Sequence, residues 1–118
     1  MLIDAPDQVR TPADAIRIFV ARLSERYEIR GTAAYEGFEN GVIRRDTGLN
    51  LVVVLRHEMQ DPASVATDMG WDALTLYLES GFRIVPIPVF HDHWQEPELA
   101  PDPEAIRRLK MRSVWLWL

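Results

Sequence analysis

The chain has 118 residues, of which 47% are hydrophobic and 26% are charged, and its formal net charge is -5. This length and composition predict a single globular domain over residues 1–118 with an ordinary core. The acidic balance argues against a protein whose main task is to grip nucleic acid, because such proteins usually present a basic face to the phosphates.

The chain contains no cysteine, which excludes disulfide frameworks and thiolate metal sites. Its first residues lack the basic and apolar regions of a secretory signal peptide. No apolar run approaches the roughly 20 residues that are needed to span a bilayer. We therefore expect a cytoplasmic protein with no membrane partner.

The first predicted helix covers residues 12–27 and follows an extended lead-in over residues 1–10. Thr11 is suited to the N-cap, and Pro12 to the first helical position, where its missing N–H does no harm. Apolar residues recur at helical spacing and form one stripe, made of Ile16, Phe19, Val20, Leu23 and Tyr27. Residues 28–35 are then predicted as a strand, and residues 36–41 as a loop or a single helical turn.

A turn followed by a buried strand is predicted at the centre of the chain. Asp46 and Thr47 can hydrogen-bond to their own backbone, and Gly48 accepts a positive φ without steric cost. The apolar, β-branched run at the end of residues 49–55 is typical of a strand that is buried on both faces in the middle of a sheet. Polar residues at the start of such a strand are where a site would be built.

The next predicted helix covers residues 62–80, with Asp61 as its N-cap and Gly81 as its C-terminal stop. Its buried face is predicted to contain Val65, Met69, Ala73 and Leu76, and to be widened by Trp71, Leu74 and Leu78. Residues 82–90 are predicted as a strand at the border of the sheet. Pro86 and Pro88 remove two donors from the same edge of that strand, so this edge cannot be fully paired.

Residues 91–97 are predicted as a turn or short helix anchored by Trp94. A last helix starts at Asp102, and residues 113–118 close the chain as a short strand. Both faces of this strand are apolar, because Trp115 and Trp117 alternate with three aliphatic residues. The two indoles are therefore covered either by another helix of the same chain or by a partner chain, and we consider Trp115 and Trp117 as candidate partner-binding residues.

This layout and the residues around the central turn resemble the minimal nucleotidyltransferase (MNT) family of the polymerase-β-like superfamily. The family signature is a strand ending in aromatic-Gly-Ser, a short Arg-rich helix ending in Gly, and an Asp-x-Asp pair entering an apolar strand. Residues 35–55 can be laid on it without a gap. Residues 81–94 and 105–117 look like the family's third catalytic strand and its closing helix and strand.

The resemblance implies an α/β (α+β) fold with a mixed sheet of about four strands. These strands are residues 28–35, 49–55, 82–90 and 113–118. The two long helices pack on one face of the sheet, and a short helix precedes the C-terminal strand.

The catalytic motif of the family is degenerate in this chain. The phosphate-binding Gly-Ser falls on Glu36 and Gly37, and the two metal-binding aspartates fall on Gly48 and Asn50. The third carboxylate should lie among residues 83–85, none of which is acidic. The structural members of the pattern, Gly41 and Asp46, are kept.

Loss of the carboxylates removes the metal ions on which nucleotidyl transfer depends. Metal stabilisation is worth several kcal/mol, so its loss costs on the order of three or more decades in rate. Glu36 adds to this, because a carboxylate repels a phosphate. The resemblance then implies a catalytically degenerate protein without a cofactor that acts as a protein-binding module of the antitoxin or regulatory type. Its implied partner is a HEPN-type helical ribonuclease, or it forms a dimer with itself.

Two alternatives remain open. Glu36, Glu39 and Asp46 are weak candidates for displaced ligands that hold Mg²⁺ in an active nucleotidyltransferase, and a shifted third strand would bring Glu79 near the cleft. The other alternative is a pseudoenzyme that senses a nucleotide without turning it over.

For three further polar groups we favour interpretations without a functional role. The sequence His91-Asp92-His93 is similar to a metal-binding pattern, but it has no further ligand at a recognisable spacing, so we interpret it as a solvated turn. His57 follows the central strand alone and receives no role. Arg44 and Arg45 precede the degenerate site and are interpreted as surface residues.

Overall fold

The structure of the protein is a computed structural model that describes residues 12–35, 38–39, 42–43, 48–57 and 59–116. Its elements follow in the order α1 (Pro12–Leu23), β1 (Ile29–Ala34), β2 (Phe38–Glu39), β3 (Val42–Ile43), β4 (Leu49–Leu55), α2 (Pro62–Ser80), β5 (Ile84–Phe90), α3 (His91–Gln95), a 3₁₀ turn (Pro97–Leu99), α4 (Pro103–Arg112) and β6 (Val114–Leu116).

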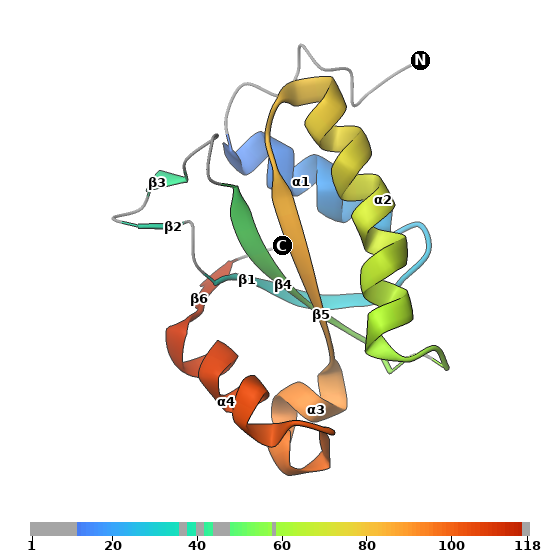
Figure 1. The fold of residues 1–118 in the computed structure, drawn as a ribbon, viewed down its shortest axis with the longest axis vertical. Helices are drawn as coiled ribbons and strands as arrows, with labels where there is room; N and C mark the ends of the chain where they lie inside the picture. Colours follow the sequence, from blue (N-terminus) through green and yellow to red (C-terminus); the bar gives the residue numbers. More distant parts are fainter. Residues whose placement is uncertain (1–11, 36–37, 40–41, 44–47, 58, 117–118) are drawn as a thin grey trace.

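Four of these strands form one mixed sheet in the order β5-β4-β1-β6. β4 and β5 are parallel, whereas β1 is antiparallel to both β4 and β6. Figure 1 shows α1 and α2 together on one side of this sheet and α3 and α4 on the other. The predicted α/β class, the four strands and the two long helices on one face are thereby confirmed.

β4 is the buried centre of the molecule, as its apolar run predicts. Leu51, Val53 and Leu55 belong to the core that α1 and α2 cover. Val52 and Val54 face the other way, into a second core that contains Trp94. Because side chains alternate along a strand, two apolar layers require an unbroken apolar run in the strand between them.

The bounds of α2 match those predicted, since both ends carry the expected caps. The carboxylate of Asp61 accepts a hydrogen bond from the amide of Ser64 at 2.8 Å. Gly81 has a φ of 78°, and its N–H donates to the carbonyl of Tyr77 at 2.7 Å. No helix among the described residues is both long and apolar enough to cross a membrane.

The prediction that three further apolar residues widen the buried face of α2 is wrong. Trp71, Leu74 and Leu78 are 66%, 45% and 74% exposed. Successive helical residues are about 100° apart, which puts these three on the side of α2 that faces away from the buried set. The helix is apolar on both sides, and its outer side has no cover within the described chain.

Several other boundaries differ from the prediction, and β5, for example, begins at Ile84 and not at residue 82. α1 ends at Leu23 and not at residue 27, because the chain then turns toward β1 with a hydrogen bond from the Arg26 amide to the Leu23 carbonyl at 2.9 Å. Residues 38–39 and 42–43 form a small antiparallel ladder where the sequence predicted a loop or helical turn. The edge position of β5, with Pro86 and Pro88, is confirmed, since β5 pairs with β4 alone among the described strands.

Trp115 is seated on a glycine of the neighbouring strand. A Cβ at Gly31 would lie 2.3 Å from two ring carbons of the Trp115 indole, so a larger residue there would force the indole to move. The other side of the indole approaches Trp94, with ring centroids 6.1 Å apart. Trp115 is still 52% exposed, so its own chain covers about half of it.

We predict that Gly31→Ala destabilises the protein by about 1–3 kcal/mol, since the added methyl group overpacks the indole. Urea unfolding measures the change. In a Trp115→Ala background the same substitution should cost much less, because the clash is gone. An equal cost in both backgrounds would contradict the contact.

α2 carries three charged residues, and each is paired with an arginine that precedes β1. Arg26 contacts Asp68 and Asp72 at 2.9 and 2.6 Å. Arg22 contacts Glu79 at 2.7 Å. All three acidic residues thus lie on the flank of α2 that faces α1.

Asp68 also accepts a hydrogen bond from the Tyr27 hydroxyl at 2.5 Å. This bond, together with Arg26, holds the pKa of Asp68 below its usual range. A carboxyl whose folded-state pKa is depressed contributes stability above its unfolded pKa of about 3.9, and the contribution is lost as the pH falls through the folded value.

We therefore predict that Asp68→Asn lowers the free energy of unfolding near pH 7 by up to about 1 kcal/mol, since the pair is partly exposed. The difference from the wild type should vanish in acid, where the wild-type carboxyl is also neutral. Urea unfolding at both pH values measures this. A loss of equal size at both would rule out the ionised carboxylate as its source.

Candidate functional site

Gly48 and Asn50, two of the positions that the resemblance assigns to the catalytic motif, lie at the amino-terminal end of the parallel β4–β5 pair. Asn50 is the register partner of Val85, and the Leu49 amide donates to the Arg83 carbonyl at 3.0 Å. Gly48 and Asn50 therefore lie beside residues 83–85, as the resemblance implies for the two aspartates and the third carboxylate.

The described side chains that meet there include no carboxylate. Gly48 has a φ of 80°, and a Cβ on it would lie 3.1 Å from Cγ and Cδ of Arg83. The guanidinium of Arg83 stands over the Tyr77 ring, 5.2 Å from its centroid. A glycine with positive φ, the amide of Asn50 and a cation thus lie at the positions that the resemblance assigns to three acids.

The other motif residues fall outside the described side chains. Glu36, Gly37 and Asp46 lie outside the described residues, and for Glu39 the backbone of β2 alone is described. The metal-binding role of these carboxylates stays a prediction. The Glu79 carboxylate forms an ion pair with Arg22. The register between β4 and β5 shows no shift that would bring Glu79 near the cleft.

A second group of polar side chains meets at the opposite end of the same strand pair. Leu55 and Phe90 are register partners at the ends of β4 and β5. His57 follows β4, while Asp92 and His93 belong to α3, which follows β5 directly. His57, Asp92 and His93, hereafter the His–Asp cluster, each offer a ligand atom within 4.8 Å of the others.

The closest contact in the cluster joins His57 to Asp92. Nδ1 of His57 is 3.2 Å from each carboxylate oxygen. Burial of Asp92 disfavours its charge, but the His57 hydrogen bond and the nearby His93 and His57 rings outweigh it and hold the pKa of Asp92 below its usual range. The carboxylate is therefore ionised at neutral pH.

A buried phenylalanine orients both imidazoles. Phe90 is 3% exposed. Its ring centroid is 4.4 Å from that of His57 and 5.6 Å from that of His93. The two imidazoles meet edge to face, with centroids 5.6 Å apart.

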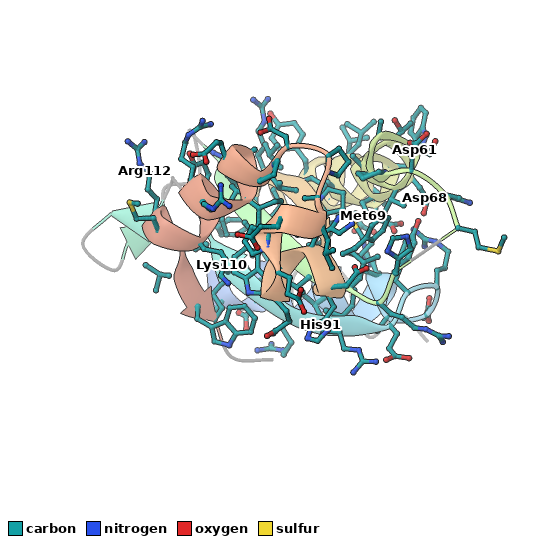
Figure 2. The ribbon with its side chains drawn as sticks, turned by 90° about the horizontal axis from the view of Figure 1, so that it is seen from below. Asp61, Asp68, Met69, His91, Lys110 and Arg112 are labelled. Carbon is teal, nitrogen blue, oxygen red and sulfur yellow. The ribbon has the colours of Figure 1, made fainter. Side chains whose placement is uncertain are left out.

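Sequence reasoning did not reveal this cluster, because it interpreted residues 91–93 as a solvated turn and gave His57 no role. Residues 91–95 are helical, so the His91 and His93 rings point to different sides, and His91 approaches Gln95 instead, at 3.4 Å between their Nε2 atoms. Figure 2 views the molecule from this side and shows His91 on α3 and Lys110 on α4. The missed signal was that His57 and residues 92–93 follow two neighbouring parallel strands.

Lys110 joins α4 to α3. Its ammonium donates to the Trp94 carbonyl at 2.8 Å and lies 5.6 Å from the centre of the Trp94 ring. The short helix is thereby held in place under β5 and keeps the cluster residues at the strand ends. The predicted anchoring role of Trp94 is confirmed, since Trp94 is only 9% exposed.

No family model, curated protein or solved structure matches this chain. Fold class and site geometry therefore come from the chain itself. The nucleotidyltransferase resemblance, the partner and the absence of a cofactor stay predictions.

Proposed function

We propose that this protein is a non-catalytic protein-binding module that binds a second copy of itself through the outer face of α2. This outer face consists of Thr67, Gly70, Trp71, Leu74 and Leu78. The observation that carries the proposal is the large exposed area of Trp71, Leu74 and Leu78 on one side of a helix whose other side is the core. Clustered exposed apolar side chains of this kind mark interaction sites.

The charge distribution on α2 favours a second copy as the occupant. All three charged residues of the helix are acidic and are paired with Arg22 or Arg26 on one flank. The outer face is uncharged, so a partner of opposite charge has nothing to pair with there. Two copies of a chain with net charge -5 can meet across this face without opposing like charges.

Gly70 supports a close crossing of two helices. A glycine inside a helix costs about 1 kcal/mol relative to alanine. Among the described residues, a Cβ at Gly70 would meet nothing within 4 Å, so no contact in the described part of the chain requires the glycine. In a symmetric dimer, Gly70 gives Trp71 of the other copy a flat surface to pack on, since the distance between packed helices depends on the side chains at the contact.

The size of the face is sufficient for a specific contact. Two copies with one Trp and two Leu each at the centre, together with the surrounding residues, would bury on the order of 1,000 Å², the lower limit for a biological interface. Trp is also the residue most often responsible for binding energy at such contacts.

The strand-end geometry supports the non-catalytic part of the proposal. Gly48, Asn50 and Arg83 supply no carboxylate where the family pattern needs three. The proposal includes the cytoplasmic location expected from the sequence. It differs from the sequence-based expectation in the binding surface, since Trp115 packs on Gly31 and Trp94 while Trp117 lies outside the described residues.

We predict that the wild type forms a dimer in sedimentation equilibrium and that Trp71→Glu and Leu78→Glu each weaken dimerisation at least about tenfold, or about 1.4 kcal/mol. Met111→Glu is the matched control, because Met111 is an 83% exposed apolar residue on α4. It should leave the dimer unchanged.

Gly70→Ala gives a second, independent readout. It should stabilise the isolated chain toward urea by up to about 1 kcal/mol through helix propensity, and weaken the dimer through the added methyl groups. A wild type that is monomeric up to about 1 mM would overturn self-association. So would a dimer that both Trp71→Glu and Leu78→Glu leave intact.

For the non-catalytic part, we predict no nucleotide transfer from labelled ATP with Mg²⁺ or Mn²⁺ above the level of an Asp46→Ala variant. The physical reason is the loss of carboxylate-held metal, worth on the order of three or more decades in rate. Incorporation that depends on Asp46 would identify an active enzyme. Calorimetric titration with ATP, GTP, CTP and UTP tests the nucleotide-sensing alternative, and saturable binding would favour it.

A further inference from the structure

We propose that the His–Asp cluster of His57, Asp92 and His93 binds a divalent transition-metal ion, with Zn²⁺ as the reference ion. This site is separate from the outer face of α2 and from the degenerate motif at the other end of β4. It uses two of the three histidines of the chain.

The distances suit one small ion. Two donors on a tetrahedral ion with bonds of about 2.1 Å are roughly 3.4 Å apart. His57 Nδ1 and the Asp92 oxygens are already 3.2 Å apart, so the ion can take the place of the hydrogen-bonding proton between them. All three donors lie within 4.8 Å of one another, and the proposal requires His93 to move toward the other two when the ion binds.

The surroundings hold the donors in position. The Phe90 ring, which is buried, backs both imidazoles at 4.4 and 5.6 Å. The His93 amide donates to Asp92 Oδ1 at 3.1 Å and fixes the carboxylate. Packed neighbours of this kind reduce the ordering that the ligands must undergo when the metal binds.

The site is open to the ion on its outer side. The side chains of His57 and Asp92 are 54% and 47% exposed, so a hydrated ion reaches them without rearrangement of the core. The position at the carboxyl ends of two adjacent parallel strands is also where α/β sheets usually hold their ligands.

The donor types select the class of metal. Two imidazoles and one carboxylate suit Zn²⁺ and its neighbours Co²⁺ and Ni²⁺, whereas Mg²⁺ and Ca²⁺ prefer oxygen donors alone. Three protein ligands leave a fourth position for water. This is the pattern of open zinc sites and not of closed structural ones.

The test is a Zn²⁺ titration of the full chain, purified without a histidine tag, in competition with a chromophoric chelator. We expect one Zn²⁺ per chain. His57→Gln and His93→Gln should each weaken binding at least about tenfold, as the loss of one ligand requires. His91→Gln is the matched control and should bind as the wild type does, because His91 approaches Gln95 outside the cluster.

Two further readouts keep the outcome decisive. The absorption spectrum of the Co²⁺-loaded protein should show tetrahedral coordination in the wild type and in His91→Gln, and should change in Asp92→Asn. Circular dichroism of the metal-free variants checks their folding, and Asp92→Asn replaces any variant that unfolds.

Zn²⁺ binding below one ion per chain, or equal affinity in the wild type, His57→Gln and His93→Gln, would overturn the site. Sedimentation of His57→Gln should show an unchanged dimer, so failure of the metal site and of the α2 interface are distinguishable.

Discussion

The parallel pairing of β4 with β5 is the constraint on which the rest of this structure depends. Both strands run in one direction, so their amino-terminal ends meet at one edge and their carboxyl-terminal ends at the other. One register therefore places Gly48 and Asn50 beside Arg83 and also places Leu55 beside Phe90. The residues around Gly48 and Asn50 and the His–Asp cluster therefore lie at the two ends of a single ladder. A shift of that ladder by one residue would turn every side chain of β4 to the wrong layer, and burial on both faces prevents it.

The packing of α2 on the sheet and against α1 also explains why this helix has two apolar sides. Its buried side completes the core that contains Leu51, Val53 and Leu55. Its acidic residues are all turned toward α1, where Arg22 and Arg26 neutralise them. With its charges used on that flank, α2 has an uncharged outer side. The charged flank and the exposed apolar side of α2 are therefore separate because α2 is paired with α1 and the turn after it through these ion pairs.

Local sequence patterns predicted the elements well where one physical rule dominated. Asp61 and Gly81 define the two ends of α2 because a capping carboxylate and a left-handed glycine act within a few residues. Pro86 and Pro88 predicted the edge position of β5 for the same reason. Each lacks a backbone N–H donor, and both missing donors lie on the same edge of the strand. The four strands of the mixed sheet followed from the resemblance and agree with the structure, whereas their order across the sheet was not predicted. The carboxyl-terminal end of α1 and the small β2–β3 ladder were missed because they depend on how the chain turns in space.

The difference between local rules and contacts that form only in space also explains why sequence reasoning missed the His–Asp cluster and the outer face of α2. His57 and Asp92 are 35 residues apart, so their hydrogen bond depends on strand order and not on spacing. In α2, apolar residues surround most of the helix, and periodicity alone does not say which side is core. Only the position of the sheet decides that Met69 is buried and Trp71 exposed.

Trp94 and Trp115 form a contact that also depends on the fold and not on their spacing in the sequence. Two indoles that lie 21 positions apart in the chain share one contact, because Gly31 of β1 leaves the room for it. Functional assignment in a chain of this size therefore rests on non-local neighbours, and these are the contacts that the sheet order determines.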